Sequence, residues 1–268
     1  MKLKLSMVAV AAMAAVSTAQ ADGFVNGGFE DGNTNGWTIG GGYRGSVYNN
    51  TFTPLMTPSQ FLPGGSLYNA GIAGSHSAVI DKNYVDPRVP ANLLGSTVYS
   101  GNYALRVEDT TFGGYASVAT QTVTNYTEAN IFFAWKSVLL GAHSNYDAAT
   151  MLITLTDKTD NVELIRREYN AASGGGGVSP IFSQSGGNFY TPNWQIEQLA
   201  IDSSLSGHTF ELSVLAADCQ PTGHWGYVYL DGFGSVTPPP GVPEPASLAL
   251  VGLALAGAAG ARRRAKKA

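Results

Sequence analysis

The feature that most constrains the fold is the lack of helical periodicity between residues 22 and 237. No segment there repeats apolar residues every 3.6 positions over three turns, whereas short runs of β-branched and aromatic residues occur throughout. In one of these runs, Phe210, Leu212 and Val214 alternate with polar neighbours, as in a strand that is buried on one face. Turns rich in Gly, Asn, Asp and Pro separate the runs. The pattern predicts an all-β fold, namely a single antiparallel β-sandwich or jelly roll.

Ten segments of this domain are expected to form strands: Phe24–Phe29, Ser77–Ile80, Thr97–Val107, Tyr115–Thr124, Asn130–Leu139, Thr150–Thr156, Val162–Tyr169, Trp194–Ile201, Thr209–Ala216 and Gly226–Val236. Two stretches, 40–75 and 171–190, read as loops because Gly, Asn, Pro and Ser dominate them. The run Gly174–Gly177 is expected at a hairpin tip, since no helix or Lys-Ser/Thr follows it as in a phosphate-binding loop.

The first 21 residues have the three parts of a secretory signal peptide. Lys2 and Lys4 supply positive charge, an apolar stretch follows, and Ala19 and Ala21 provide the small residues that precede a cleavage site. We expect the Sec export machinery to recognise residues 1–21 and cleavage to occur before Asp22. The alternative is an uncleaved N-terminal anchor.

The other end of the chain predicts a membrane tether. A Pro-rich linker (238–245) precedes an uncharged segment (246–261), which as a helix would be about 24 Å long and is expected to span the membrane. The basic tail (262–268) would stop transfer and stay cytoplasmic through Arg262, Arg263, Arg264, Lys266 and Lys267. The alternative is a buried C-terminal core helix with a solvated tail.

The sequence Val242-Pro243-Glu244-Pro245, the short apolar helix and the basic cluster together resemble the PEP-CTERM sorting signal of Gram-negative bacteria. The resemblance implies processing by exosortase near Pro243, Glu244 and Pro245, and export alongside exopolysaccharide. It implies a transient inner-membrane anchor with the domain in the periplasm, followed by a cell-surface or extracellular location.

Charge and cysteine content exclude several classes of function. The predicted domain 22–237 has 8 Lys and Arg against 18 Asp and Glu, so its net charge is −10. Such a domain will not bind nucleic acid or anionic lipid through non-specific electrostatics, but it is compatible with cations and neutral sugars. The single cysteine, Cys219, excludes an intrachain disulfide and a Cys-rich zinc site.

Three further segments carry a second resemblance. They are Asn26-Gly-Gly-Phe-Glu30 with a following Trp37, Ser100-Gly-Asn-Tyr-Ala-Leu105, and the closing Tyr227-Val-Tyr-Leu-Asp231. Their order is similar to that in galactose-binding-like jelly-roll carbohydrate-binding modules, which often hold a structural calcium ion.

The resemblance implies that Glu30 and Asp231 are calcium ligands, completed by carbonyls near Gly28 and between residues 100 and 102. Two carboxylates with several carbonyls would satisfy the six to eight oxygens that calcium prefers. The departure from that family is Gly232, which stands where a second Asp or Asn is common. The alternative is that both acids are ordinary turn residues.

Carbohydrate sites use aromatic faces against sugar C–H groups. The candidates outside the expected strands are aromatic residues near the start of the domain: Trp37, Tyr43, Tyr48, Tyr68 and Tyr84. The alternative is that the aromatic residues belong to the core, as expected for Trp135.

The chain is not expected to be an enzyme. Cys219 and His224 are five positions apart and could pair in nucleophilic catalysis, but an unpaired cysteine is more often buried and inert. The four histidines have no ligand spacing, so zinc is not expected. We expect an exported surface or matrix protein associated with exopolysaccharide or carbohydrate; the alternatives are a structural or adhesive protein without a sugar site, and a secreted glycan-active hydrolase.

Overall fold

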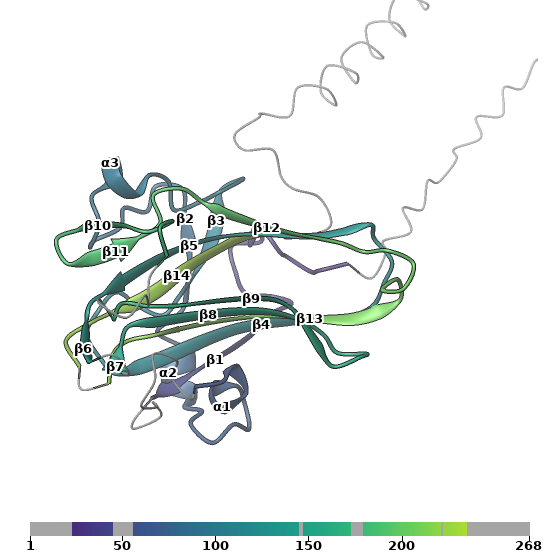
Figure 1. Cartoon of the computed structure of the whole chain (residues 1–268), viewed down its shortest axis with the longest axis horizontal. Coiled ribbons are helices and arrows are strands. Elements are labelled where there is room, and N and C mark those ends of the chain that lie inside the picture. The colour runs from purple at the N-terminus through teal and green to yellow at the C-terminus, as the bar shows by residue number, and fades with distance from the viewer. Residues whose placement is uncertain (1–22, 45–55, 145–146, 173–178, 221, 235–268) are drawn as a thin grey trace, which may run out of the picture.

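Two antiparallel sheets packed face to face form the body of the protein (Figure 1). The structure is a computed structural model and describes residues 23–44, 56–144, 147–172, 179–220 and 222–234. The all-β fold predicted from the sequence is confirmed, because all the strand pairs in the described residues are antiparallel.

The first sheet has five strands in the order β1-β4-β13-β8-β9. Their bounds are β1 Thr38–Tyr43, β4 Tyr115–Tyr126, β8 Thr150–Asp157, β9 Val162–Asn170 and β13 His208–Ala217. The long central pair β4 and β13 remains in register from Phe210 to Ala217.

The second sheet follows the order β10-β11-β5-β14-β3-β2, and β12 pairs with β5 on the same edge as β11. Its strands are β2 Ala78–Asp81, β3 Tyr103–Val107, β5 Asn130–Leu140, β10 Ser183–Ser185, β11 Asn188–Tyr190, β12 Gln195–Ala200 and β14 Gly226–Gly234. A small separate pair consists of β6 Ala142–Ser144 and β7 Asp147–Ala148.

The main core lies between the two sheets. From β13 it takes Phe210, Leu212 and Val214, the residues whose alternation the sequence shows, and from β14 it takes Val228 and Leu230. All five are fully buried. Burial of apolar surface stabilises a folded protein by about 25 cal/mol per Å², and this layer is expected to supply most of that stabilisation here.

The outer face of the first sheet is covered as well. The two four-residue helices α1 (Pro58–Phe61) and α2 (Ala70–Ala73) lie outside it (Figure 1). They approach β1 closely because that strand has three consecutive glycines: a Cβ on Gly40 would lie 2.4 Å from the Phe61 oxygen, and a Cβ on Gly42 would lie 1.8 Å from the Leu67 oxygen.

The outer face of the second sheet carries the segment with α3 (Ala91–Leu94). Its anchor is Asp86, whose carboxylate accepts hydrogen bonds from the hydroxyls of Tyr227 and Tyr229 at 2.6–3.0 Å. The buried Lys136 donates to the carbonyls of Leu94 and Ser96, and burial lowers its pKa to about 8. Polar residues of the sheet thus hold this covering segment.

Eight of the ten expected strands appear within a few residues of their predicted bounds, and two expectations need correction. Phe24–Phe29 is a turn, because Asn26 and Phe29 adopt positive φ of 50° and 58°. Of Thr97–Val107 only β3 is a strand, since the main-chain N–H groups of Tyr99 and Ser100 bind Asp231 instead of a neighbouring strand.

The two stretches expected as loops also contain regular structure. Residues 40–75 include most of β1 together with α1 and α2, and residues 171–190 include the β10–β11 hairpin. The predicted signal peptide, Pro-rich linker, membrane helix and basic tail lie outside the described residues, as do Tyr48 and Gly174–Gly177. Among the described residues, no helix has the length and apolar character needed to cross a membrane.

Candidate functional site

The two ends of strand β4 mark two regions where chemically useful side chains gather. Tyr126, the last residue of β4, lines a pocket together with Glu30 and Asp231. Tyr115, the first residue, contacts Tyr43 and lies beside the segment that connects β13 to β14. Twelve residues of strand at about 3.3 Å each separate the two regions by roughly 40 Å.

The first region is a pocket of about 370 Å³, which we call the carboxylate pocket. Its lining includes Gly28, Glu30, Ser100 and Asp231, so the structure brings the two predicted calcium ligands to one place. The three segments that resemble carbohydrate-binding modules therefore meet at this end of the sandwich.

Asp231 is fully buried, and main-chain N–H groups bind its carboxylate. Oδ2 accepts from Tyr99 at 2.8 Å and from Ser100 at 3.0 Å, and Oδ1 accepts from Gly232 at 2.6 Å. Burial raises the pKa of Asp231 to about 7, although these hydrogen bonds act in the opposite direction. The carboxyl group of Asp231 is therefore expected to lose its proton at a higher pH than an exposed aspartate.

Glu30 binds the turn before β3. Its carboxylate accepts from the main-chain N–H groups of Asn102 and Tyr103 at 2.9–3.1 Å and from the Asn102 side chain at 3.3 Å. Gly101 is required beside it, because its φ is +70° and an added Cβ would lie 2.4 Å from Oε1 of Glu30.

These contacts bear on the calcium prediction. A carboxylate has about four acceptor positions, and those of Glu30 are taken by N–H groups. Asp231 keeps one, on Oδ1. The two acids do not form a ready calcium cage as they stand, so a shared calcium site stays a prediction. Melting temperatures measured with and without a chelator would test it.

The predicted sugar-binding aromatics do not form one surface. Trp37 is only 8% exposed and packs against Phe29 and Phe233, so its ring belongs to the core and is not a platform. Tyr84 is half-buried, and its hydroxyl accepts a hydrogen bond from Arg106 at 3.1 Å. Tyr68 is half-buried and lines a separate shallow pocket beside α2.

Tyr43 differs from the others because it is 50% exposed, at the end of β1. Phe112, which the sequence reading did not select, is 56% exposed. Tyr43 lies against Gly114, and Phe112 stacks on Trp225 with ring centroids 4.9 Å apart. The two exposed rings thus belong to one edge of the sandwich, which we call the aromatic edge. In the sequence, the feature that could have indicated Phe112 is an aromatic residue inside the Thr-Thr-Phe-Gly-Gly turn.

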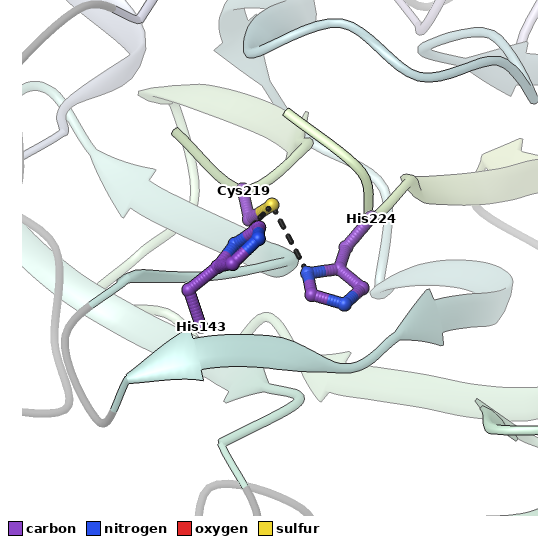
Figure 2. A group of neighbouring side chains, drawn as sticks. All are labelled: His143, Cys219 and His224. Carbon is purple, nitrogen blue, oxygen red and sulfur yellow. Dashed lines mark hydrogen bonds between the residues drawn. The ribbon is translucent and has the colours of Figure 1, made fainter. Parts of the chain in front are cut away.

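Beside this edge, His143, Cys219 and His224 form a compact group, which we call the His–Cys cluster (Figure 2). His143 comes from β6, and the other two come from the segment between β13 and β14. Sγ of Cys219 lies 3.2 Å from Nδ1 of both histidines. The spacing of the four histidines along the sequence therefore does not show that two of them meet at Cys219. The sequence suggests the pairing of Cys219 with His224 but not the presence of His143, which is 76 positions from Cys219.

The cysteine and His224 are both uncharged in their surroundings. Burial raises the pKa of the Cys219 thiol to about 11. The pKa of the His224 imidazole is lowered, first by burial and then by the neighbouring His143. A protonated thiol is a weak nucleophile, so the Cys219–His224 pair lacks the activated state that covalent catalysis needs.

Comparison with known proteins gives one sequence match and several distant structural ones. The family described as the PEP-CTERM protein-sorting motif matches residues 241–264, and no curated protein matches the chain by sequence. Among solved structures, TmCBM61 in complex with β-1,4-galactotriose is 11% identical with a TM-score of 0.38, over 78% of this chain and 94% of that chain.

Two other structures are similar to the same degree. The non-crystalline cellulose specific carbohydrate-binding module CBM28 is 11% identical with a TM-score of 0.36, covering 78% of this chain and 92% of its own. A cleaved adhesin domain of Lys-gingipain from Porphyromonas gingivalis is 11% identical with a TM-score of 0.32, covering 77% and 94%. The sequence match confirms the sorting signal, and this chain is therefore an exported protein that carries a PEP-CTERM protein-sorting motif of the kind processed by exosortase.

Proposed function

We propose that the chain is a non-enzymatic surface or matrix protein whose β-sandwich contacts carbohydrate of the exopolysaccharide through the aromatic edge. The observation that carries the proposal is the sorting motif at residues 241–264, which directs a β-sandwich domain out of the cell. Release from a transient membrane anchor would leave that domain at the cell surface or in the matrix.

The aromatic edge has the chemistry that sugars require. Tyr43 and Phe112 expose half or more of their surface, and an exposed aromatic face binds the C–H groups of a sugar ring. Polar groups flank the rings: Gln220 lies 3.4 Å from the Tyr43 hydroxyl, and the Arg88 guanidinium is 3.8 Å from the Trp225 ring centre. These amide and guanidinium groups supply hydrogen-bond donors for sugar hydroxyls.

Charge favours a neutral glycan over an anionic one. The domain between residues 22 and 237 has a net charge of −10, so an acidic polysaccharide would be repelled at low salt. A neutral glycan is not repelled in this way. We therefore expect neutral sugar polymers as the ligand class.

Two features support a binding role over a hydrolytic one. Glycoside hydrolysis requires two carboxyl groups facing the bond to be cleaved. In the carboxylate pocket, Glu30 and Asp231 are engaged by main-chain N–H groups, and at the other end the thiol of Cys219 stays protonated. Neither arrangement offers a free acid–base pair.

Binding of the purified full-length protein to an array of neutral and acidic glycans tests the proposal. We expect binding to neutral glycans, and we expect Tyr43→Ala and Phe112→Ala each to weaken it about tenfold, equivalent to about 1.4 kcal/mol. Ile196→Ala is the matched control, because Ile196 is 42% exposed on β12, away from this edge.

Failure to bind any glycan, with the protein folded, would contradict the proposal and favour a structural or adhesive protein without a sugar site. Equal binding by both aromatic variants and the control would place the sugar contact elsewhere. Release of reducing sugar from a bound glycan would contradict the non-enzymatic role.

A further inference from the structure

The His–Cys cluster brings three metal-binding side chains together from parts of the chain that are far apart. The potential ligand atoms of His143, Cys219 and His224 all lie within 4.8 Å of one another. The two imidazole rings flank the sulfur, with their ring centres 4.5 Å apart, and each presents Nδ1 to it (Figure 2).

Hydrogen bonding alone gives a poor account of this arrangement. A thiol carries one proton, so the sulfur can donate to one imidazole and must accept from the other, and sulfur is weak in both roles. One thiolate and two neutral imidazoles are, in contrast, a common donor set for zinc and copper.

The surrounding backbone leaves room for the two rings. Gly141 has a φ of +57°, and a Cβ there would lie 3.1 Å from the His224 ring. Gly223 has a φ of +110°, and its Cβ would lie 3.6 Å from the His143 ring. Glycine thus stands where each ring passes the main chain.

Hydrogen bonds also fix the segment that carries two of the three donors. The N–H of Cys219 donates to the carbonyl of His224 at 3.1 Å, which closes the turn between them. The N–H of Gln220 donates to Oδ1 of Asp147 at 2.8 Å, and this buried carboxylate ties the turn to β7, next to the strand of His143. These hydrogen bonds thus hold the turn that carries Cys219 and His224.

We propose that His143, Cys219 and His224 bind a thiophilic first-row transition-metal ion, with Zn²⁺ as the expected occupant. Metal–sulfur and metal–nitrogen bonds of about 2.3 and 2.0 Å in a tetrahedron place sulfur and nitrogen about 3.5 Å apart. The observed separations of 3.2 Å require only a small outward shift. Binding releases the thiol proton, and the two imidazoles coordinate as neutral ligands.

Three protein ligands leave a fourth position on the ion. His143 is exposed whereas Cys219 is buried, so the open position is expected on the His143 side, toward solvent. Asp147, Asp218 and the buried Arg44 all lie near the cluster, so ionisable groups of both signs surround the proposed site.

Titration of the purified full-length protein with Co²⁺, under reducing conditions and without a polyhistidine tag, tests the site. We expect one equivalent of Co²⁺ to produce a thiolate-to-cobalt charge-transfer band together with strong visible bands of a four-coordinate ion, and Zn²⁺ to abolish both. Cys219 is the only cysteine, so any thiolate band must come from it.

Three variants complete the test. Cys219→Ser should abolish the thiolate band. His143→Ala should weaken binding by more than the roughly 10- to 100-fold that losing an outer-shell partner costs. Because His143 is exposed, this variant is expected to fold even if Cys219→Ser does not. His208→Ala is the control, since that histidine pairs with Asp157 elsewhere.

A wild-type protein that shows no thiolate band with Co²⁺ would overturn the proposal. An unchanged affinity in His143→Ala would overturn it as well, because the band would then arise from the thiol without this ligand. Weakening by His208→Ala equal to that by His143→Ala would indicate non-specific binding to histidines and would also count against the site.

Discussion

Asp231 shows how one buried residue can make the stability of the protein depend on pH. Its folded-state pKa of about 7 is above the unfolded value of 3.8, so the folded state binds the proton more tightly. The contribution to stability is therefore fully present below about pH 4 and is lost as pH rises through 7.

We expect the free energy of unfolding to fall by about 1 kcal/mol per pH unit on account of this residue between pH 5 and 7. His76 and His208 act in the same direction at higher pH, because pairing with Glu108 and Asp157 raises the pKa of each. The comparison must therefore be made between wild type and Asp231→Asn, by urea denaturation across this range.

The Asn variant cannot titrate, so its stability should depend less steeply on pH than that of the wild type. If the free energy of unfolding had the same pH dependence in both proteins, Asp231 would be ionised throughout this range. Its hydrogen bonds to main-chain N–H groups would then offset the effect of burial on its pKa. The variant is also expected to be less stable at every pH, since an amide offers fewer acceptor positions to Tyr99, Ser100 and Gly232.

Single residues also show where sequence reasoning succeeded and where it could not. Glu30 and Asp231 were placed together by a resemblance, and they do line one pocket. Only part of the His–Cys cluster had a local signal: Cys219 and His224 are five positions apart, whereas His143 reaches Cys219 only through the pairing of β6 with β7 and the β13–β14 turn. The prediction for Trp37 is wrong because a turn sequence does not reveal that its ring packs against Phe29 and Phe233 in the core.

Among the elements, strand β1 makes the most specific demand on sequence. Its three glycines give it weak strand propensity, and the sequence reading accordingly placed it in a loop. The structure explains the glycines by close approach, because Gly42 has no side chain where the Leu67 carbonyl passes. Alternation predicted the strands that face the main core, while helices of four residues such as α1 and α2 are too short to show a period.

Gly42→Ala is therefore expected to lift the α1–α2 segment from the sheet. The added methyl group would lie 1.8 Å from the Leu67 oxygen, so the backbone must move, at a cost of about 1–3 kcal/mol. We expect a lower melting temperature and faster proteolysis within residues 57–74. Gly234→Ala is the control at another strand glycine, because a Cβ on Gly234, the last residue of β14, would meet nothing within 4 Å.

A melting temperature of Gly42→Ala equal to that of the wild type would contradict this account of β1. An equal loss of stability in both variants would point instead to a general intolerance of side chains at strand glycines. Either result would separate close approach from chain flexibility as the reason for the glycine run.

For the whole molecule, the charge distribution separates the exported domain from its sorting signal. Seven of the fifteen Lys and Arg residues lie in the two terminal segments, and the domain between them is strongly acidic. The acidic domain has little affinity for an anionic membrane, so its retention there depends on the sorting segment. Cleavage near Pro243, Glu244 and Pro245 should then convert an anchored protein into a released one.

Mass spectrometry of the released product tests this step. We expect a C-terminus near residue 243 and no peptide containing Arg262 or Lys267, since the basic tail stays with the membrane fragment. Glu244→Ala is expected to leave the chain anchored and at full length. Pro239→Ala, in the linker outside the matched motif, should be processed like the wild type. A released product that retains Arg262 would mean that the tail crosses the membrane intact, and it would remove cleavage as the route by which the sandwich reaches the matrix.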